Sequence, residues 1–95
     1  MAGGGSFYGD QQSAHATGDG QLVTNRARVT SIQAKGIATS EVKLYDGTSA
    51  AGTLKLDYVF GIEGLNTWIP GSGVVFDDGV YLDLTNTTGV TITYT

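Results

Sequence analysis

Near the C-terminus of the chain, apolar and polar positions alternate with a period of two. Every second residue of 80–84 is a valine or a leucine, and in residues 90–94 the apolar residues alternate with threonine. The polar sequence Asn-Thr-Thr-Gly separates the two runs at residues 86–89. Alternation on either side of a polar connection is typical of two antiparallel strands that share one buried face. The pattern therefore predicts a β-hairpin over residues 80–94.

Shorter segments of the same kind precede this hairpin. The clearest is residues 53–60, where the even-numbered residues are large and apolar and the odd-numbered ones are mostly polar. In residues 21–33, which form one long strand or two short ones, the alternation slips between Val29 and Ile32, and such a slip indicates a β-bulge or a bend. The other predicted strands are residues 41–45, 66–69 and 74–76, separated by glycine-containing turns at residues 46–47, 70–73 and 77–79.

Seven or eight short strands without a helical period predict an all-β fold. Glycine occurs 15 times and proline once, which fits a chain with frequent turns better than a helical one. We expect a small antiparallel β-sandwich in residues 21–95. The choice between a jelly-roll and an immunoglobulin-like topology stays open, because strand order depends on pairings that one sequence does not encode.

Residues 1–20 differ in composition from the rest of the chain. They are rich in glycine, alanine, serine, glutamine and aspartate, with Phe7 and Tyr8 as their only phenylalanine and tyrosine. Such a segment buries too little apolar surface to offset the entropy lost when it becomes ordered. We expect an extended N-terminal arm that is ordered by a partner and contacts it through Phe7 and Tyr8. The alternative is an arm that folds back on its own domain.

The small size of the domain favours self-association. A chain of 95 residues buries a modest fraction of its surface, and disulfides, metals or oligomerisation commonly add the missing stability. Cysteine is absent and His15 is the single histidine, which excludes disulfides, zinc–thiolate sites and histidine-cluster metal sites. Oligomerisation remains, so we expect a homo-oligomer.

Charge and hydropathy argue against two classes of partner. The net charge is −4 and the sequence pI is about 4.5, and only Arg26 and Arg28 among the basic residues are close together. Nucleic-acid binding requires clustered lysine and arginine. No apolar run approaches the roughly 20 residues of a membrane span, and the N-terminus lacks the features of a secretory signal. We expect neither a nucleic-acid nor a membrane partner, and a chain made and used in the cytosol.

No residue pattern indicates catalysis. His15 lies beside Ser13 and Thr17 in the predicted arm, and a flexible arm does not hold catalytic geometry to within about 0.5 Å, so we interpret His15 as a solvated or partner-contacting side chain. Asp77 and Asp78 precede a glycine and are typical of a turn. Structural calcium, which takes about 6–8 oxygen ligands, stays open as an alternative. The glycine clusters lack the helix that follows a phosphate-binding loop. We expect no enzyme activity and no cofactor.

Trp68, beside Asn66 and Thr67, is the strongest candidate for a recognition surface. A tryptophan near a turn can cover one end of the core, anchor a protein interface or stack on a sugar ring, and these three alternatives stay open. Tyr81 is opposite in phase to the apolar residues around it, and Val59 lies on the mostly polar face of its segment. We therefore expect Tyr81 and Val59 to leave the core and to mark a face for subunit contacts.

Three phrases of the sequence resemble those of a known family. They are Val-Lys-Leu-Tyr-Asp-Gly at residues 42–47, Ile-Pro-Gly-Ser-Gly at residues 69–73 and Gly-Val-Tyr-Leu-Asp-Leu-Thr-Asn at residues 79–86. In these strand and turn phrases the chain resembles short virion structural proteins of tailed bacteriophages, above all those of marine and cyanobacterial phages. The resemblance covers about residues 20–95. It implies a non-enzymatic β-sandwich that packs with copies of itself on the particle, and it carries over no functional residue.

The expected function is that of a capsid decoration (cement) protein. We expect a trimer that binds the major capsid protein or another virion protein through its N-terminal arm and its sandwich, located on the virion after assembly in the host cytoplasm. The alternative is a small phage tail, fibre or host-adhesion subunit whose carbohydrate-binding face includes Trp68. A third class is a monomeric carbohydrate-binding module that belongs to no virion.

Overall fold

The structure is a computed structural model that describes residues 11–95. Every secondary-structure element in this range is a β-strand, which confirms the predicted all-β fold. No helix in the described part of the chain has the length and apolarity needed to cross a membrane. The strands are β1 (Gln12–Ala16), β2 (Gly20–Val23), β3 (Ala27–Asp46), β4 (Thr53–Phe60), β5 (Leu65–Trp68), β6 (Val74–Phe76) and β7 (Val80–Tyr94).

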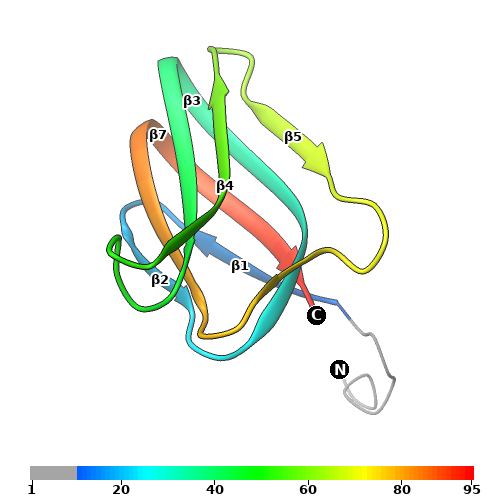
Figure 1. Cartoon of the computed structure of the whole chain (residues 1–95). Helices are drawn as coiled ribbons and strands as arrows, with labels where there is room; N and C mark the ends of the chain where they lie inside the picture. The colour runs from blue at the N-terminus through cyan, green and yellow to red at the C-terminus, as the bar shows by residue number, and fades with distance from the viewer. Residues whose placement is uncertain (1–10) are drawn as a thin grey trace.

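Two long strands, β3 and β7, organise the sheet. They pair antiparallel over almost their whole length, from Val29 opposite Tyr94 to Asp46 opposite Val80. β1 and β2 pair with the free edge of β7, and β4, β5 and β6 pair with the free edge of β3, all antiparallel. Figure 1 shows that β3 and β7 bend at the same end of the molecule. The sheet therefore folds over on itself.

The bend divides the sheet into two halves that face each other across one core. The first half-sheet consists of β2, residues 80–85 of β7, residues 41–46 of β3, and β4. The second half-sheet consists of β1, residues 90–94 of β7, residues 27–35 of β3, β5 and β6. Both contribute to the core, whose fully buried apolar side chains are Val29, Ile32, Val42, Leu44, Phe76, Val80, Leu82, Val90 and Ile92. The architecture is sandwich-like.

Local hydrogen bonds and one glycine hold the bend. Residues 37–40 of β3 lie opposite Asn86 alone. Ser40 Oγ donates to the Asn86 carbonyl at 2.6 Å, and Asn86 Nδ2 donates to the Thr39 carbonyl at 3.2 Å. Asn86 has a φ of 50°, a left-handed conformation that asparagine adopts more readily than most residues. A Cβ on Gly36 would overlap the Ser40 side chain, so the bend requires glycine at this position.

The predicted C-terminal hairpin is wrong. Residues 86–89 do not reverse the chain but carry β7 through the bend, so the runs 80–84 and 90–94 pair with β3 and not with each other. The predicted inward phase is nevertheless confirmed, because Val80, Leu82, Val90 and Ile92 are all fully buried. A period of two specifies which side chains face the core, whereas the pairing partner depends on the long β3 strand.

The break in alternation between Val29 and Ile32 is a β-bulge, as predicted. The register with β7 shifts between Val29 and Ser31, which leaves Thr30 as the extra residue. Thr30 is buried, and its hydroxyl donates to the Thr93 carbonyl at 3.1 Å. Because of the bulge, Val29 and Ile32 both point into the core although they are three positions apart.

The sheet begins earlier in the chain than the predicted boundary at residue 21. Residues 12–16, which the sequence assigned to the arm, form the edge strand β1 and pair with β7. Ala14 and Ala16 pack partly against the core. Because their side chains are small, main-chain hydrogen bonds to β7 are the main contacts that hold β1 in the sheet. Residues 1–10, which include Phe7 and Tyr8, lie outside the described residues.

Candidate binding site

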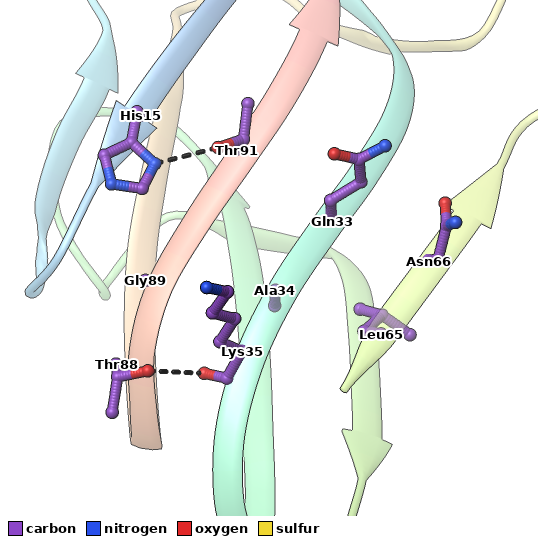
Figure 2. A pocket seen from close by; sticks show the side chains of 9 residues that line it. All are labelled: His15, Gln33, Ala34, Lys35, Leu65, Asn66, Thr88, Gly89 and Thr91. Carbon is purple, nitrogen blue, oxygen red and sulfur yellow. Dashed lines mark hydrogen bonds between the residues drawn. The ribbon is translucent and has the colours of Figure 1, made fainter. Parts of the chain in front are cut away.

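A hollow of about 570 Å³ opens on the outer face of the second half-sheet (Figure 2). Four adjacent strands line it, in the spatial order β1, β7, β3 and β5. The lining residues are His15, Gln33, Ala34, Lys35, Leu65, Asn66, Thr88, Gly89 and Thr91. The hollow therefore depends on the sheet register and combines residues from both ends of the described chain.

Strand pairing aligns the polar side chains of the hollow in a row across the four strands. His15 on β1 is opposite Thr91 on β7, Thr91 is opposite Gln33 on β3, and Gln33 is opposite Asn66 on β5. We call these four residues the amide row. Because paired residues project from the same face of a sheet, the four side chains lie side by side across the outer surface.

A second row runs beside the amide row on the same face. It consists of the aligned residues Ser13, Thr93, Ser31 and Trp68, each two positions from its neighbour in the amide row. We call it the tryptophan row. Ser31 Oγ and Thr93 Oγ1 are hydrogen-bonded at 2.6 Å. The Trp68 side chain is 71% exposed at the end of this row, so it flanks the hollow next to Asn66.

Gly89 forms the floor of the hollow between His15 and Lys35. Lys35 is directly opposite Gly89 in the register, and Figure 2 shows its ammonium end directed toward β7. A Cβ at residue 89 would lie 3.3 Å from His15 Cε1 and 3.7 Å from His15 Nε2. The missing side chain therefore leaves room above the backbone, with the imidazole on one side and the lysine on the other.

Hydrogen bonds orient two side chains of the site. His15 Nδ1 is 2.8 Å from Thr91 Oγ1, which leaves Nε2 facing away from that bond (Figure 2). Thr88 Oγ1 donates to the Lys35 carbonyl at 3.2 Å and ties β7 to β3 beside the hollow. The remaining polar groups, on Gln33 and Asn66, are exposed and supply amide donors and acceptors.

The partner of the His15 ring is a hydroxyl group. His15 is exposed and its hydrogen-bond partner is Thr91, and none of the carboxylates in residues 11–95 hydrogen-bonds to its ring. In the same part of the chain, no three histidine, cysteine, aspartate or glutamate side chains gather as a metal site would require.

The outer face of the first half-sheet has a different chemistry. Lys43 on β3 is opposite Asp57 on β4 and Asp83 on β7, and Glu41 lies two positions before Lys43 on β3. A hydrogen bond with Asp57, with smaller effects of desolvation and of the Asp57 charge, raises the pKa of Glu41. Around Lys43 this face is acidic, because three carboxylates surround that lysine.

The structure separates the residues that the sequence grouped as an interface. Trp68 is highly exposed, which excludes its proposed role as a cover of the core, and it lies on the second half-sheet. Val59, 72% exposed, and the half-buried Tyr81 lie on the outer face of the first half-sheet. Their partners on β3, Glu41 and Tyr45, are four positions apart, about 13 Å along the strand, with Lys43 between them.

Sequence reasoning missed most residues of the hollow. Gln33, Lys35 and Thr91 are polar positions in correctly predicted alternating segments, but their phase shows only that they face outward. His15 was interpreted as part of a flexible arm, and its alignment with Thr91 depends on the unexpected strand β1. The signal for the site therefore lies in the register between strands.

A second hollow, of about 440 Å³, lies at the start of β3. Its lining includes Arg26 and Arg28, the pair of neighbouring basic residues in the sequence. Arg26 Nε forms an exposed ion pair with Asp77 Oδ1 at 3.5 Å. Arg28 exchanges two main-chain hydrogen bonds with Thr95, so its backbone continues the β3–β7 pairing.

Comparison of the chain with protein-family models, with curated proteins and with solved structures found no match.

Proposed function

We propose that the chain is a structural subunit of a tailed-bacteriophage virion, a decoration protein that binds the major capsid protein or another virion protein and self-associates as a trimer. The resemblance in its strand and turn phrases supports the virion setting. Two of those phrases, residues 42–47 and 79–86, are paired neighbours in the first half-sheet. They therefore describe one structural unit, the centre of that half-sheet.

Exposed apolar side chains at the bent end of the molecule carry the proposal. Ile37 lies in the bend and is 56% exposed, Val59 near the end of β4 is 72% exposed, and Ile62 in the following loop is 79% exposed. Val59 is opposite Glu41, the first residue of β3 after the bend. Large apolar groups exposed at one end of a small domain support a contact with protein.

Light scattering of the purified chain tests the self-association. We expect a trimer, and we expect the double variant Val59→Asp, Ile62→Asp to be monomeric with an unchanged fold. Leu54→Asp is the matched control, because Leu54 is 45% exposed near the opposite end of β4 and should leave the trimer intact. A wild-type monomer at all concentrations contradicts the trimer.

Attachment to the particle is tested by a truncation that leaves the described strands complete. Deletion of residues 2–19 would remove β1, whereas deletion of residues 2–10 retains all seven strands. We expect the shorter deletion to fold like the full chain but not to co-sediment with capsids of the phage that encodes it. Undiminished co-sedimentation would show that residues 2–10 take no part in attachment.

A host-adhesion subunit of the tail or fibre is the second candidate function. The exposure of Trp68 beside a hollow with hydroxyl and amide groups favours it, because aromatic rings next to such groups are suited to sugars. This candidate predicts glycan binding by the isolated protein, which the decoration role alone does not require.

A further inference from the structure

The charged residues are unevenly distributed between the two half-sheets. The strands of the second half-sheet contain Arg28 and Lys35 and none of the acidic residues of the described chain. Those of the first contain Glu41, Asp46, Asp57 and Asp83 against two lysines. The chain has a net charge of −4, but the lining of the hollow contains a lysine and no carboxylate. The hollow is therefore a place on the surface that favours an anion.

The space above Gly89 fits a compact anionic group. Lys35 is aligned with Gly89 on one side, and His15 Nε2, the ring nitrogen not bonded to Thr91, lies on the other. Both are nitrogen groups that can donate hydrogen bonds to an oxyanion. A carboxylate or a sulfate ester placed over Gly89 would lie between the lysine and the imidazole.

Neutral hydrogen-bonding groups extend from this position toward Trp68. Gln33 and Asn66 are aligned neighbours on β3 and β5, and each amide offers donors and an acceptor to vicinal hydroxyl groups. Trp68 then presents an exposed ring, which suits the apolar face of a sugar. From Gly89 to Trp68 the span is about 16 Å, counted from strand spacings and rise per residue, and exceeds one sugar ring.

We propose that the hollow binds an anionic saccharide. Its carboxylate or sulfate lies over Gly89 between Lys35 and His15, its ring hydroxyls contact Gln33 and Asn66, and a further sugar ring stacks on Trp68. The inference deepens the second candidate function and rests on it. Loss of the trimer or of capsid attachment would leave it unaffected, and failure to bind glycans would leave the decoration role unaffected.

A glycan array probed with the full chain tests the ligand class. The array carries uronate-bearing, sialate-bearing and sulfated glycans beside their neutral parent sugars. Binding confined to anionic glycans supports the proposal, and the preferred series identifies the anion as carboxylate or sulfate. Binding to none of the glycans, or equal binding to the neutral parents, overturns it.

Titration of the best array ligand identifies the site. Trp68 is the only tryptophan, so a change in its fluorescence on binding reports a ligand beside that ring. Lys35→Gln should weaken binding about tenfold or more, as expected for loss of a hydrogen bond to a charged group. Lys43→Gln is the matched control, because it makes the same charge change on the opposite outer face. Equal weakening by both variants would indicate non-specific attraction and overturn the site.

Two further variants distinguish the contribution of Gly89 to binding from that of Trp68. Calorimetry measures the affinity of both, because one of them lacks the tryptophan that gives the fluorescence signal. Gly89→Val should abolish binding by filling the floor and displacing His15, and Trp68→Ala should reduce it by about tenfold through lost stacking. Thermal melting confirms that each variant is folded. Wild-type affinity in a folded Gly89→Val protein overturns the proposed position of the anion.

Discussion

The two half-sheets have similar inner faces and different outer faces. Inside, each contributes fully buried aliphatic residues to one core. Outside, the first presents carboxylates around Lys43, whereas the second presents amides, hydroxyls, His15 and Trp68 around a hollow. Because β3 and β7 run through both halves, the same two strands carry both surfaces. The fold thus requires apolar residues at the inward positions of each strand and leaves the residue types at the outward positions free to differ.

Truncation of core residues gives the largest expected effect and tests the similarity of the inner faces. Leu44→Ala in the first half-sheet and Ile32→Ala in the second each remove a fully buried side chain. Each should lower the free energy of unfolding by about 3 kcal/mol, as for other large-to-small core changes. Urea unfolding measures the loss, with the exposed Ile37→Ala as a control of little effect. Two separate transitions in either variant would show that the halves have independent cores.

The connection between the halves is tested at Gly36. An alanine Cβ would overlap Ser40 Oγ and lie 2.8 Å from Phe60 Cε2, so Gly36→Ala should destabilise the protein by about 2 kcal/mol. Gly18→Ala is the matched control, because a Cβ at Gly18 meets nothing within 4 Å. Equal melting temperatures of the two variants would contradict the bend as described.

Asp46 closes the far end of the first half-sheet. Its carboxylate accepts hydrogen bonds from the main-chain N–H groups of Asp78 at 2.8 Å and Asp77 at 3.0 Å. The hydrogen bond from Asp78 has the largest effect, and the two bonds together lower the pKa of Asp46. Desolvation has a smaller effect in the opposite direction. Asp46→Ala should destabilise the protein by about 1 kcal/mol at neutral pH.

The pH dependence of this effect follows from the direction of the shift. A lowered pKa in the folded state contributes stability above the unfolded value of about 3.9, and that stability is lost as the pH falls through the lower folded value. The difference between wild type and Asp46→Ala should therefore shrink below pH 4. Melting temperatures between pH 3 and pH 8 measure it, and a difference that grows on acidification would contradict the assignment.

Glu41 gives the smallest expected effect, with the opposite sign. Its raised pKa contributes stability at pH values below the unfolded value of about 4.3, and that stability is lost as the pH rises through the folded value. Glu41→Gln removes the repulsion from Asp57 and should slightly raise the melting temperature at pH 7 and leave it unchanged at pH 3. The double variant with Asp57→Asn should gain less than the sum of the two single variants, since they relieve the same repulsion.

The sequence predicted the inward phase of β3 and β7 but not their pairing partners. In β4 the predicted common face of Leu54, Leu56, Tyr58 and Phe60 is wrong for Leu54, which a register shift leaves 45% exposed. The bulge at Thr30, the inward phase of β7 and the exposure of Val59 follow from local alternation, and all three are confirmed. The predicted hairpin failed because residues 86–89 are turn-forming in isolation, whereas in the structure Thr88 and Asn86 bond to β3. Local propensity does not include a partner strand that is distant in sequence.

The candidate site was predictable only in part. Trp68 and Asn66 were recognised because a tryptophan beside polar residues near a turn is informative on its own. Gln33, Thr91 and His15 join them only through the pairing of β1, β7, β3 and β5. The place of His15 in a strand was the least predictable feature of the site. An edge strand made of small and polar residues has almost no hydrophobic pattern.

The position of β7 in the sheet has a consequence for how the chain folds during synthesis. β7 follows every other strand in the chain but is central in space, and Gln12 and Tyr94, which face each other in the sheet, are 82 positions apart. Until β7 has been synthesised, β1 and β2 have no paired strand, and β3 keeps one unpaired edge. Long-range pairing of this kind slows folding and exposes nascent strands to other chains. The central pairing of the sheet therefore forms only once β7 has been synthesised, and until then the edges that pair with β7 are open to other chains.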